Sequence, residues 1–268
     1  HVLVEKPLAA SVTDCDAMIE AARAAGVKLG TVSQRRFFPA CRRIRDALDA
    51  GKLGEPVLAS VVMCGWRDRE YYEGDAWRGT WEGEGGGVLV NQAPHQLDLL
   101  LWYMGEMESV YGAWANFNHP YIEVEDSAVA TIRFKNGGLG QILVSNAQNP
   151  ALYGKVHLHG GNGASVGVQT DGGQMFIAGK SEITEPPVND LWTVAGEADQ
   201  LAEWVESDTA FFQRIRATTW FHRLQFEDFA RAVDERREPM VTGLDGKRVV
   251  QLFEAIYRSQ ETGEAVTV

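Results

Sequence analysis

Two apolar runs and one helical segment make up the start of the chain. Residues 2–4 form a short apolar run typical of a buried parallel strand, and residues 27–32 form a second one. Between them, residues 14–25 are rich in alanine and are followed by Gly26, a common helix stop. This order predicts a right-handed βαβ unit. Because one such unit cannot cover both faces of a parallel sheet, we interpret it as the C-terminal edge of a doubly wound domain.

The pattern then changes towards antiparallel sheet. Residues 39–50 predict a helix, residues 51–54 a turn, and residues 56–63 alternate as a half-buried strand does. Further segments alternate in the same way and are predicted strands: residues 109–118, 126–134, 139–146, 155–159, 165–169 and 174–178. Glycine-rich hairpin turns are predicted between them at residues 136–138, 160–163 and 171–173.

The remaining segments complete the predicted fold. Residues 179–210 carry adjacent prolines and many acids, which favours an irregular excursion or lid, whereas residues 211–235 and 244–262 have helical periodicity. The predicted fold class is therefore α/β. We expect the C-terminal edge of a Rossmann (doubly wound) domain over residues 1–34, followed over residues 35–268 by an α+β domain with a large, mostly antiparallel open sheet.

Composition narrows the classes of partner. The chain has 268 residues, 45% hydrophobic and 23% charged, which is ordinary for a globular protein. A net charge of -12 without a basic run argues against nucleic acid. No apolar segment reaches the roughly 18 residues that a membrane helix needs, and no signal peptide is evident. We therefore expect no membrane partner. Cys15, Cys41 and Cys64 are an odd number of cysteines without metal-ligand spacing, which favours reduced thiols and a cytoplasmic protein.

The run over residues 85–102 is the strongest candidate for chemistry. Its three leading glycines allow a sharp turn and a close approach to a ligand. Asn91 is a favourable N-cap and Pro94 is tolerated in a first turn, so a helix is predicted to begin near Asn91. Asn91 and His95 then share one face, where they can converge on one bound molecule. The alternative is that Asn91 only caps the helix and that His95 is a core histidine.

A lysine follows the first predicted strand directly, in Glu5-Lys6-Pro7. Open parallel sheets bind ligands at the carboxyl ends of their strands. A partly desolvated lysine there can have its pKa lowered from ~10.4 far enough to exchange protons near neutrality. Lysines after strands are also commonly just solvated, so both interpretations stay open for Lys6 taken alone.

Residues 66–81 are unusually dense in aromatic and arginine side chains for a connector. These side chains are Trp66, Arg67, Tyr71, Tyr72, Trp77, Arg78 and Trp81. Aromatic faces with flanking hydrogen-bond donors suit a sugar ring or a nicotinamide. The alternative is a loop that packs on the sheet or in a subunit contact.

The other histidines give weaker signals. His157 and His159 lie two apart on a predicted strand and face the same side, as a metal pair could, but no third ligand is recognisable nearby. We therefore predict no metal site. His222 opens a predicted helix and could be either a cap or a site residue.

Taken in order, these motifs resemble the glucose-fructose oxidoreductase / inositol dehydrogenase / MocA (Gfo/Idh/MocA) family of NAD(P)-dependent sugar and cyclitol oxidoreductases. The resemblance runs the length of the chain. Its motifs are Glu5-Lys6-Pro7, Gln34-Arg35-Arg36-Phe37 with Pro39, residues 51–54, Trp77-Arg78, residues 85–98, and a closing helix with Ser259 and Gly263.

The resemblance implies an enzyme that transfers a hydride between NAD or NADP and a secondary hydroxyl of a sugar, glycoside or cyclitol. It implies that the catalytic residues are Lys6, His95 and Asn91, with Lys6 as the catalytic lysine and His95 as the substrate-side acid/base. The implied cofactor contacts are Glu5, Lys6, Gln34, Trp77, Arg78 and His222. The implied substrate contacts are Arg67, Tyr72, Asn91, His95 and His222.

The sequence departs from the family pattern in two respects. The phosphate-binding first half of the Rossmann domain is absent from the given sequence. Asn91 stands where many members have aspartate. Two alternatives to a dehydrogenase stay open, namely a redox-cycling glycosidase or lyase of the same fold and a non-catalytic sugar-binding protein.

The predicted sheet also suggests self-association. A broad face with side chains such as Trp114, Phe117 and Ile132 is too apolar to leave in water. We therefore expect a homodimer or homotetramer through the open sheet, in addition to a small sugar-like substrate.

Overall fold

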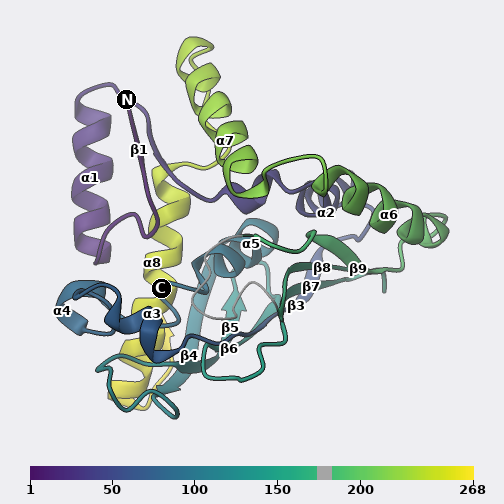
Figure 1. Cartoon of the computed structure of the whole chain (residues 1–268). Helices are drawn as coiled ribbons and strands as arrows, with labels where there is room; N and C mark the ends of the chain where they lie inside the picture. Colours follow the sequence, from purple (N-terminus) through teal and green to yellow (C-terminus); the bar gives the residue numbers. More distant parts are fainter. Residues whose placement is uncertain (174–182) are drawn as a thin grey trace.

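The computed structural model describes residues 1–173 and 183–268. It contains a two-stranded sheet and an eight-stranded sheet. The long helix α8 (Gly243–Thr262) packs against elements of both (Figure 1). Among the helices of the described part of the chain, none combines the length and the apolarity needed to cross a membrane.

The start of the chain forms the predicted βαβ unit. Strands β1 (Val2–Val4) and β2 (Leu29–Thr31) are parallel, and α1 (Val12–Ala24) joins them. The helix starts two residues before the predicted position because the side chain of Ser11 accepts a hydrogen bond from the backbone of Asp14 and caps it. The strand, helix, strand pattern was therefore sufficient to place this unit.

A short connection leads from β2 into the second sheet. It consists of a 3-10 turn, η1 (Gln34–Phe37), and then α2 (Pro39–Asp49), whose first residue is a proline. Strand β3 (Pro56–Cys64) follows and agrees with the prediction to within one residue. The turn is structurally important because it directs the side chains of Gln34, Arg35 and Arg36 into the interior, where all three are buried.

The eight-stranded sheet has the order β10-β4-β5-β6-β3-β7-β8-β9. Its other strands are β4 (Met107–Ala115), β5 (Ser127–Phe134), β6 (Leu139–Ser145), β7 (Tyr153–Gly160), β8 (Ser165–Gly172), β9 (Val188–Trp192) and β10 (Val266–Thr267). Within the described residues, β3 and β6 are its one parallel pair. This confirms the large, mostly antiparallel open sheet.

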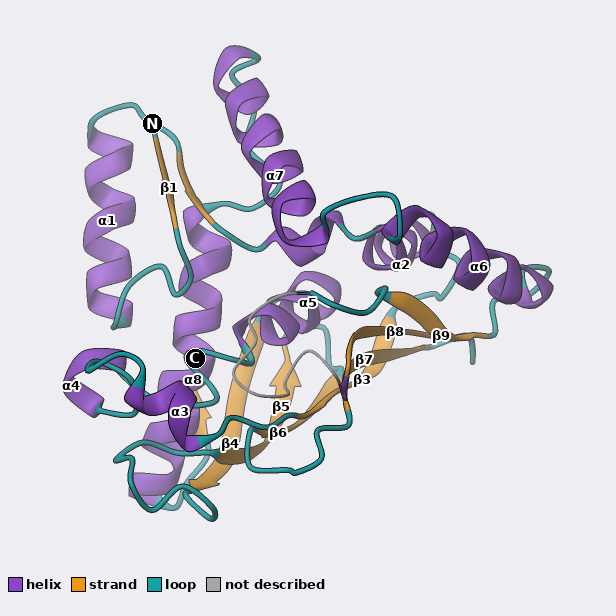
Figure 2. Ribbon diagram, viewed as in Figure 1, coloured by secondary structure: helices purple, strands orange, loops and turns teal. Residues whose placement is uncertain are grey.

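Helices cover one face of this sheet, and the other face is open (Figure 2). α5 (Pro94–Met104) and α8 lie over the covered face, where Ile132 is 2% exposed. The prediction that Ile132 belongs to the open face is therefore wrong. Large apolar side chains that are about half exposed, on strands β3 to β6, are Leu58, Tyr111, Val129 and Leu139.

The segment before α7 is more regular than predicted. Residues 188–192 form β9, and α6 (Leu201–Phe212) follows, so the prediction of an irregular 179–210 is wrong over these ranges. The many acidic residues of this segment belong to one side of an amphipathic helix. Glu203 and Glu206 are exposed, while Trp204 packs on Trp192.

Other boundaries also differ from the prediction. The single helix predicted at 211–235 is the end of α6 followed by α7 (Ala217–Asp234). The turn predicted at 171–173 is wrong in part, because β8 continues through Asp171 to Gly172. The strand predicted at 174–178 lies outside the described residues.

Candidate active site

The approach to α5 differs from the prediction at Asn91. The helix begins at Pro94 with Ala93 as its N-cap, so the prediction that Asn91 caps it is wrong. Residues 88–93 instead form turns, in which the Asn91 N–H donates to the Gly87 carbonyl at 2.9 Å. The Asn91 side chain is therefore not used for capping and extends to other partners.

The glycine run makes close approaches to the protein itself. Gly86 has φ of +152°, and a Cβ there would overlap the Tyr257 hydroxyl. A Cβ on Gly87 would overlap the backbone carbonyl of Glu125. Two of the three glycines are thus required by neighbouring residues of this chain, which the sequence pattern alone did not indicate.

Lys6 is held at the mouth of this turn by neutral oxygens. Its ammonium donates to the Asn91 carbonyl at 2.7 Å and to Asn91 Oδ1 at 2.9 Å. Burial lowers the pKa of Lys6 to about 8, although the carboxylates of Glu5 and Glu84 oppose the shift. Lys6 therefore exchanges its proton in the pH range where a general base is useful.

The amide of Asn91 is oriented by a second set of partners. Its Nδ2 donates to Glu84 Oε1 and, at 3.2 Å, to the Tyr71 hydroxyl. Glu84 ends the short helix α4 (Trp81–Glu84), and burial raises the pKa of its carboxyl. Because Glu84 accepts from the amide nitrogen, the amide oxygen faces Lys6.

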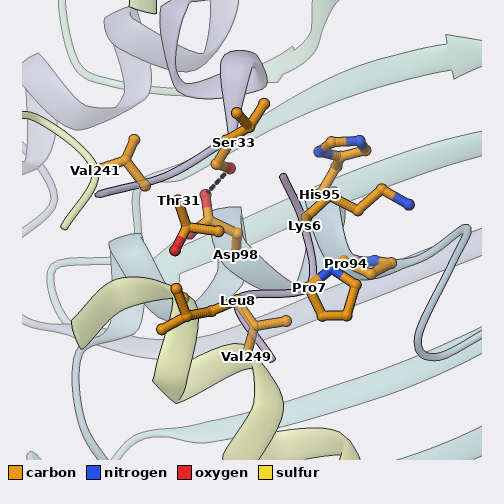
Figure 3. A pocket seen from close by; sticks show the side chains of 12 residues that line it. Lys6, Pro7, Leu8, Thr31, Ser33, Pro94, His95, Asp98, Val241 and Val249 are labelled. Carbon is orange, nitrogen blue, oxygen red and sulfur yellow. Dashed lines mark hydrogen bonds between the residues drawn. The ribbon is translucent and has the colours of Figure 1, made fainter. Parts of the chain in front are cut away.

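His95 lies in the first turn of α5, four residues after Asn91, and its side chain lies beside Lys6 (Figure 3). It is half-buried, and within the described residues its ring makes no hydrogen bond. Burial holds the pKa of His95 well below its ordinary value, and the cations Arg35 and Lys6 act in the same direction. A neutral imidazole with no hydrogen-bond partner there can accept a proton, which does not fit the alternative of a satisfied core histidine.

Lys6 and His95 border a polar cavity of about 140 Å³. The residues that line it are Lys6, Gln34, Arg35, Arg67, Tyr71, Asn91, Gln92, His95, Ile183, Thr218 and His222. Arg35 forms a buried ion pair with Asp171 of β8. Gln34 Oε1 is buried and accepts no hydrogen bond from the described residues. The cavity therefore presents several donors, and Gln34 Oε1 is an acceptor there that no described residue uses.

The same two residues border a smaller, mainly apolar cavity of about 20 Å³ (Figure 3). Its wall includes Leu8, Thr31, Val241 and Val249, and Ser33 there donates to Asp98. Lys6 and His95 thus stand between a polar space and an apolar one.

The structure brings six predicted site residues to the polar cavity. They are Lys6, Gln34, Arg67, Asn91, His95 and His222. The others lie elsewhere, and their roles stay predictions. Glu5 is exposed, Trp77 is 44% exposed, and Arg78 stacks on the Tyr71 ring at 4.0 Å. Tyr72 is buried behind the cavity wall, where its hydroxyl accepts from Asn146 at 2.8 Å.

Sequence reasoning missed several wall residues. They are Arg35, Tyr71, Gln92, Ile183 and Thr218. The sequence contained a signal for two of them, because Arg35 lies in a motif that carries the resemblance and Tyr71 lies in the aromatic segment. The others have no local signal, since the wall is assembled from distant segments of the chain.

The remaining histidines have partners of their own. His157 contacts Asp190 at 3.0 Å, while His159 contacts Ser165 at 2.8 Å. The residues that the structure describes contain no group of three or more side chains suited to hold a metal ion. His119, which the sequence analysis did not single out, is fully buried between Asp126 and the Arg67 carbonyl.

Comparison with known proteins gives a consistent family. Residues 41–166 match the family model of the GFO/IDH/MocA C-terminal domain. The chain is 27% identical to the 1,5-anhydro-D-fructose reductase of Ensifer adhaerens over 269 residues, which is 100% of this chain and 72% of that protein. It is 26% identical to the myo-inositol 2-dehydrogenase of Thermotoga maritima over 273 residues, 99% of this chain and 72% of that protein.

Solved structures agree. The WlbA dehydrogenase from Bordetella pertussis, crystallised with NADH and UDP-GlcNAcA, superposes with a TM-score of 0.79 at 30% identity. The match covers 100% of this chain and 71% of that one. Both the sheet and the βαβ unit therefore lie within the matched region.

Proposed function

The chain belongs to the GFO/IDH/MocA family of oxidoreductases, and from this premise we propose that it transfers a hydride between a nicotinamide cofactor and a secondary hydroxyl of a sugar, glycoside or cyclitol. The relatives support this class, since they include a sugar reductase, an inositol dehydrogenase and a dehydrogenase crystallised with NADH. The proposed cofactor is NAD or NADP.

The observation that carries the proposal is the setting of Lys6. Oxidation of an alcohol releases a hydroxyl proton, so the site needs a base near the reacting carbon. Lys6 has a pKa of about 8, and its ammonium is hydrogen bonded to an amide rather than to a carboxylate. His95, held neutral by burial, lies beside it as the second proton acceptor. When bound, the nicotinamide supplies the redox chemistry.

The cavity wall fits the nicotinamide end of such a cofactor. Gln34 Oε1 is buried without a donor in the described part of the chain, and the carboxamide and ribose hydroxyls of a nicotinamide nucleoside are donors. We propose that Lys6, Gln34 and His222 hold this end, and that Glu5, Trp77 and Arg78 add contacts implied by the family. Arg67, Asn91, His95 and His222, which line the cavity, are the proposed substrate contacts. Tyr72, which the family also implies, lies behind the cavity wall.

The experiment is a turnover assay of the full-length protein with NAD⁺ and NADP⁺ against a panel of sugars, glycosides and cyclitols. Steady release of reduced cofactor supports the proposal. Product formation with only catalytic amounts of cofactor would show a redox-cycling glycosidase or lyase instead. Sugar binding without any turnover would show a binding protein.

We also propose that copies of the chain associate through the open face of the eight-stranded sheet. Leu58, Tyr111, Val129 and Leu139 expose 45 to 52% of their surface there. Light scattering at micromolar concentration should show a dimer or tetramer, and Val129→Glu should shift it towards monomer. A wild-type monomer would contradict this proposal.

We also propose that the boundary between the two domains lies between residues 34 and 35, after β2 of the small sheet and before α2.

A further inference from the structure

We propose that Glu125 is a positioning residue for Lys6. Its buried carboxylate accepts hydrogen bonds from the glycine turn, which in turn provides the acceptors of the Lys6 ammonium. The same carboxylate accepts a hydrogen bond from α8, which also packs beside the segment that follows Lys6. The inference rests on the proposed role of Lys6 in proton transfer. It concerns a residue that lines neither cavity and therefore acts only through its neighbours.

The glycine turn is attached to Glu125 at three points. Glu125 Oε2 accepts from the Gly87 N–H at 2.8 Å, and Oε1 accepts from the Leu89 N–H at 3.0 Å. The backbone carbonyl of Glu125 accepts from the Val88 N–H at 3.1 Å. Glu125 is 0% exposed, so water cannot replace these bonds. The turn is thereby fixed to the segment just before β5.

Three further hydrogen bonds connect this turn to Lys6. The Gly87 carbonyl accepts from the Asn91 N–H at 2.9 Å. The Asn91 carbonyl and side-chain oxygen then accept from the Lys6 ammonium. A continuous set of hydrogen bonds therefore joins the Glu125 carboxylate to the Lys6 ammonium, and a shift of the turn would move both acceptors of Lys6.

A second connection runs through α8. Tyr257 on this helix donates its hydroxyl proton to Glu125 Oε1 at 3.0 Å. Earlier on the same helix, Gly246 lies so close to Thr31 and Leu8 that a Cβ would overlap the Thr31 side chain. Leu8 follows Lys6 by two residues. The helix thus contacts the segment that carries Lys6 near its start and the carboxylate that holds the glycine turn near its end.

The chemistry of Glu125 suits this task. Burial raises the pKa of its carboxyl to about 7, while the N–H donors and Tyr257 oppose the shift. The titratable neighbours are Tyr257, which contacts it, and Glu84, which acts on Tyr257. A glutamine would keep the size of the side chain but present an NH₂ group to one of the two backbone N–H donors, which breaks the attachment with little change in volume.

The test measures the pKa of Lys6 directly, by pH-dependent trace acetylation and mass spectrometry of the full-length protein without substrate. Wild type should give about 8. In Glu125→Gln the released turn lets water reach Lys6, so its pKa should rise towards ~10.4 and kcat should fall by ~10-fold or more, with a smaller change in KM. Tyr257→Phe, which removes one donor only, should shift the pKa in the same direction by less.

Asp228→Asn is the matched control. Asp228 is also a buried carboxylate that accepts a backbone N–H, that of Met240 at 2.8 Å, and it also pairs with Arg237. It should lose stability and leave the Lys6 pKa unchanged. An unchanged Lys6 pKa in both Glu125→Gln and Tyr257→Phe, with only a lower melting temperature, would overturn the inference.

The readout separates this inference from the proposed function. If the wild-type protein turns over no sugar or cyclitol, the proposed function fails, whereas the acetylation assay still reports whether Glu125 positions Lys6. If Lys6→Ala abolishes turnover but Glu125→Gln leaves the Lys6 pKa and kcat unchanged, only the inference about Glu125 fails.

Discussion

The surroundings of Lys6 and of Arg36 both bury a cation, but they stabilise it in different ways. Arg36 is 2% exposed and donates to both carboxylate oxygens of Asp98, at 2.6 and 2.8 Å. Asp245 lies 3.3 Å away. Burial works against the charge, but these carboxylates hold the pKa of Arg36 above its ordinary range. Lys6 donates only to neutral oxygens of Asn91, and its pKa falls to about 8.

One core can therefore hold both a permanently charged side chain and a titratable one. Two carboxylates keep the guanidinium of Arg36 charged at every physiological pH, so it serves structure. An amide partner leaves burial unopposed by a contacting charge, so Lys6 can lose its proton near neutrality. The partner, rather than the depth of burial, decides which cation is suited to chemistry.

Removal of Lys6 tests the chemical side of this comparison most strongly. In the full-length enzyme, Lys6→Ala should lower kcat by about 10² to 10⁴, the usual contribution of a positioned proton-transfer group, with a smaller effect on KM. Steady-state kinetics measure this. Lys28→Ala, which removes a lysine of the same small unit that pairs with Glu238, is the control and should keep wild-type kcat. A raised KM at unchanged kcat would make Lys6 a binding residue.

Removal of a partner of Arg36 tests the structural side. Asp98→Asn leaves a buried guanidinium poorly compensated and should lower the free energy of unfolding by about 3–5 kcal/mol. Denaturant titration measures the loss. Asp49→Asn breaks an exposed pair with Arg45 and should change it by less than about 1 kcal/mol. Equal losses in the two variants would contradict the comparison.

The pH dependence of stability sharpens the contrast. The pKa of Lys6 is lowered from 10.5 in the unfolded chain to about 8 when folded, so the unfolded state binds more protons between these values. Stability from this group is therefore lowest below pH 8 and rises towards pH 10.5, by up to about 3 kcal/mol. The free energy of unfolding should be measured for wild type and Lys6→Met at pH 7 and pH 10. From pH 7 to pH 10 the wild type should gain stability relative to Lys6→Met, because only the wild type contains the titrating lysine. Parallel pH profiles would show that the lysine is not perturbed.

The smallest expected effect comes from giving the Lys6 ammonium a carboxylate partner, as the Arg36 guanidinium has. Asn91→Asp places a carboxylate against the ammonium, and the pKa of Lys6 should rise by about one unit or more. The acidic limb of the kcat/KM profile for oxidation should move up by the same amount. Gln92→Glu is the control, because Gln92 lines the same cavity but bonds to Tyr71. Superimposable acidic limbs in Asn91→Asp and wild type would show that Lys6 is not the titrating base.

The sequence was informative where a pattern is local. Alternation fixed the antiparallel strands because each strand buries one face, and the βαβ unit followed from two apolar runs and a glycine stop. Lys6 and His95 could be singled out because each sits next to a strand end or a glycine turn. The acids of α6 concealed its apolar side, since composition was given more weight than period.

The sequence was uninformative where the deciding partner is far away. Asn91 has the residue type of a cap, yet its oxygens serve Lys6, 85 residues earlier. Tyr71 rather than Tyr72 faces the cavity, because the side chain of Asn146, which directly follows β6, donates to the Tyr72 hydroxyl. Asp171 continues a strand instead of a turn because it pairs with Arg35. No local preference predicts such contacts.

Helix α8 also sets the order in which the molecule can be assembled. Its residues are translated after β2 and β4, against which it packs, at roughly 5–20 residues per second. Until it leaves the ribosome, apolar side chains that end in the core, such as Leu8 and Val110, lack the helix that covers them. The part of the core that packs on α8 can therefore close only after this helix has been synthesised.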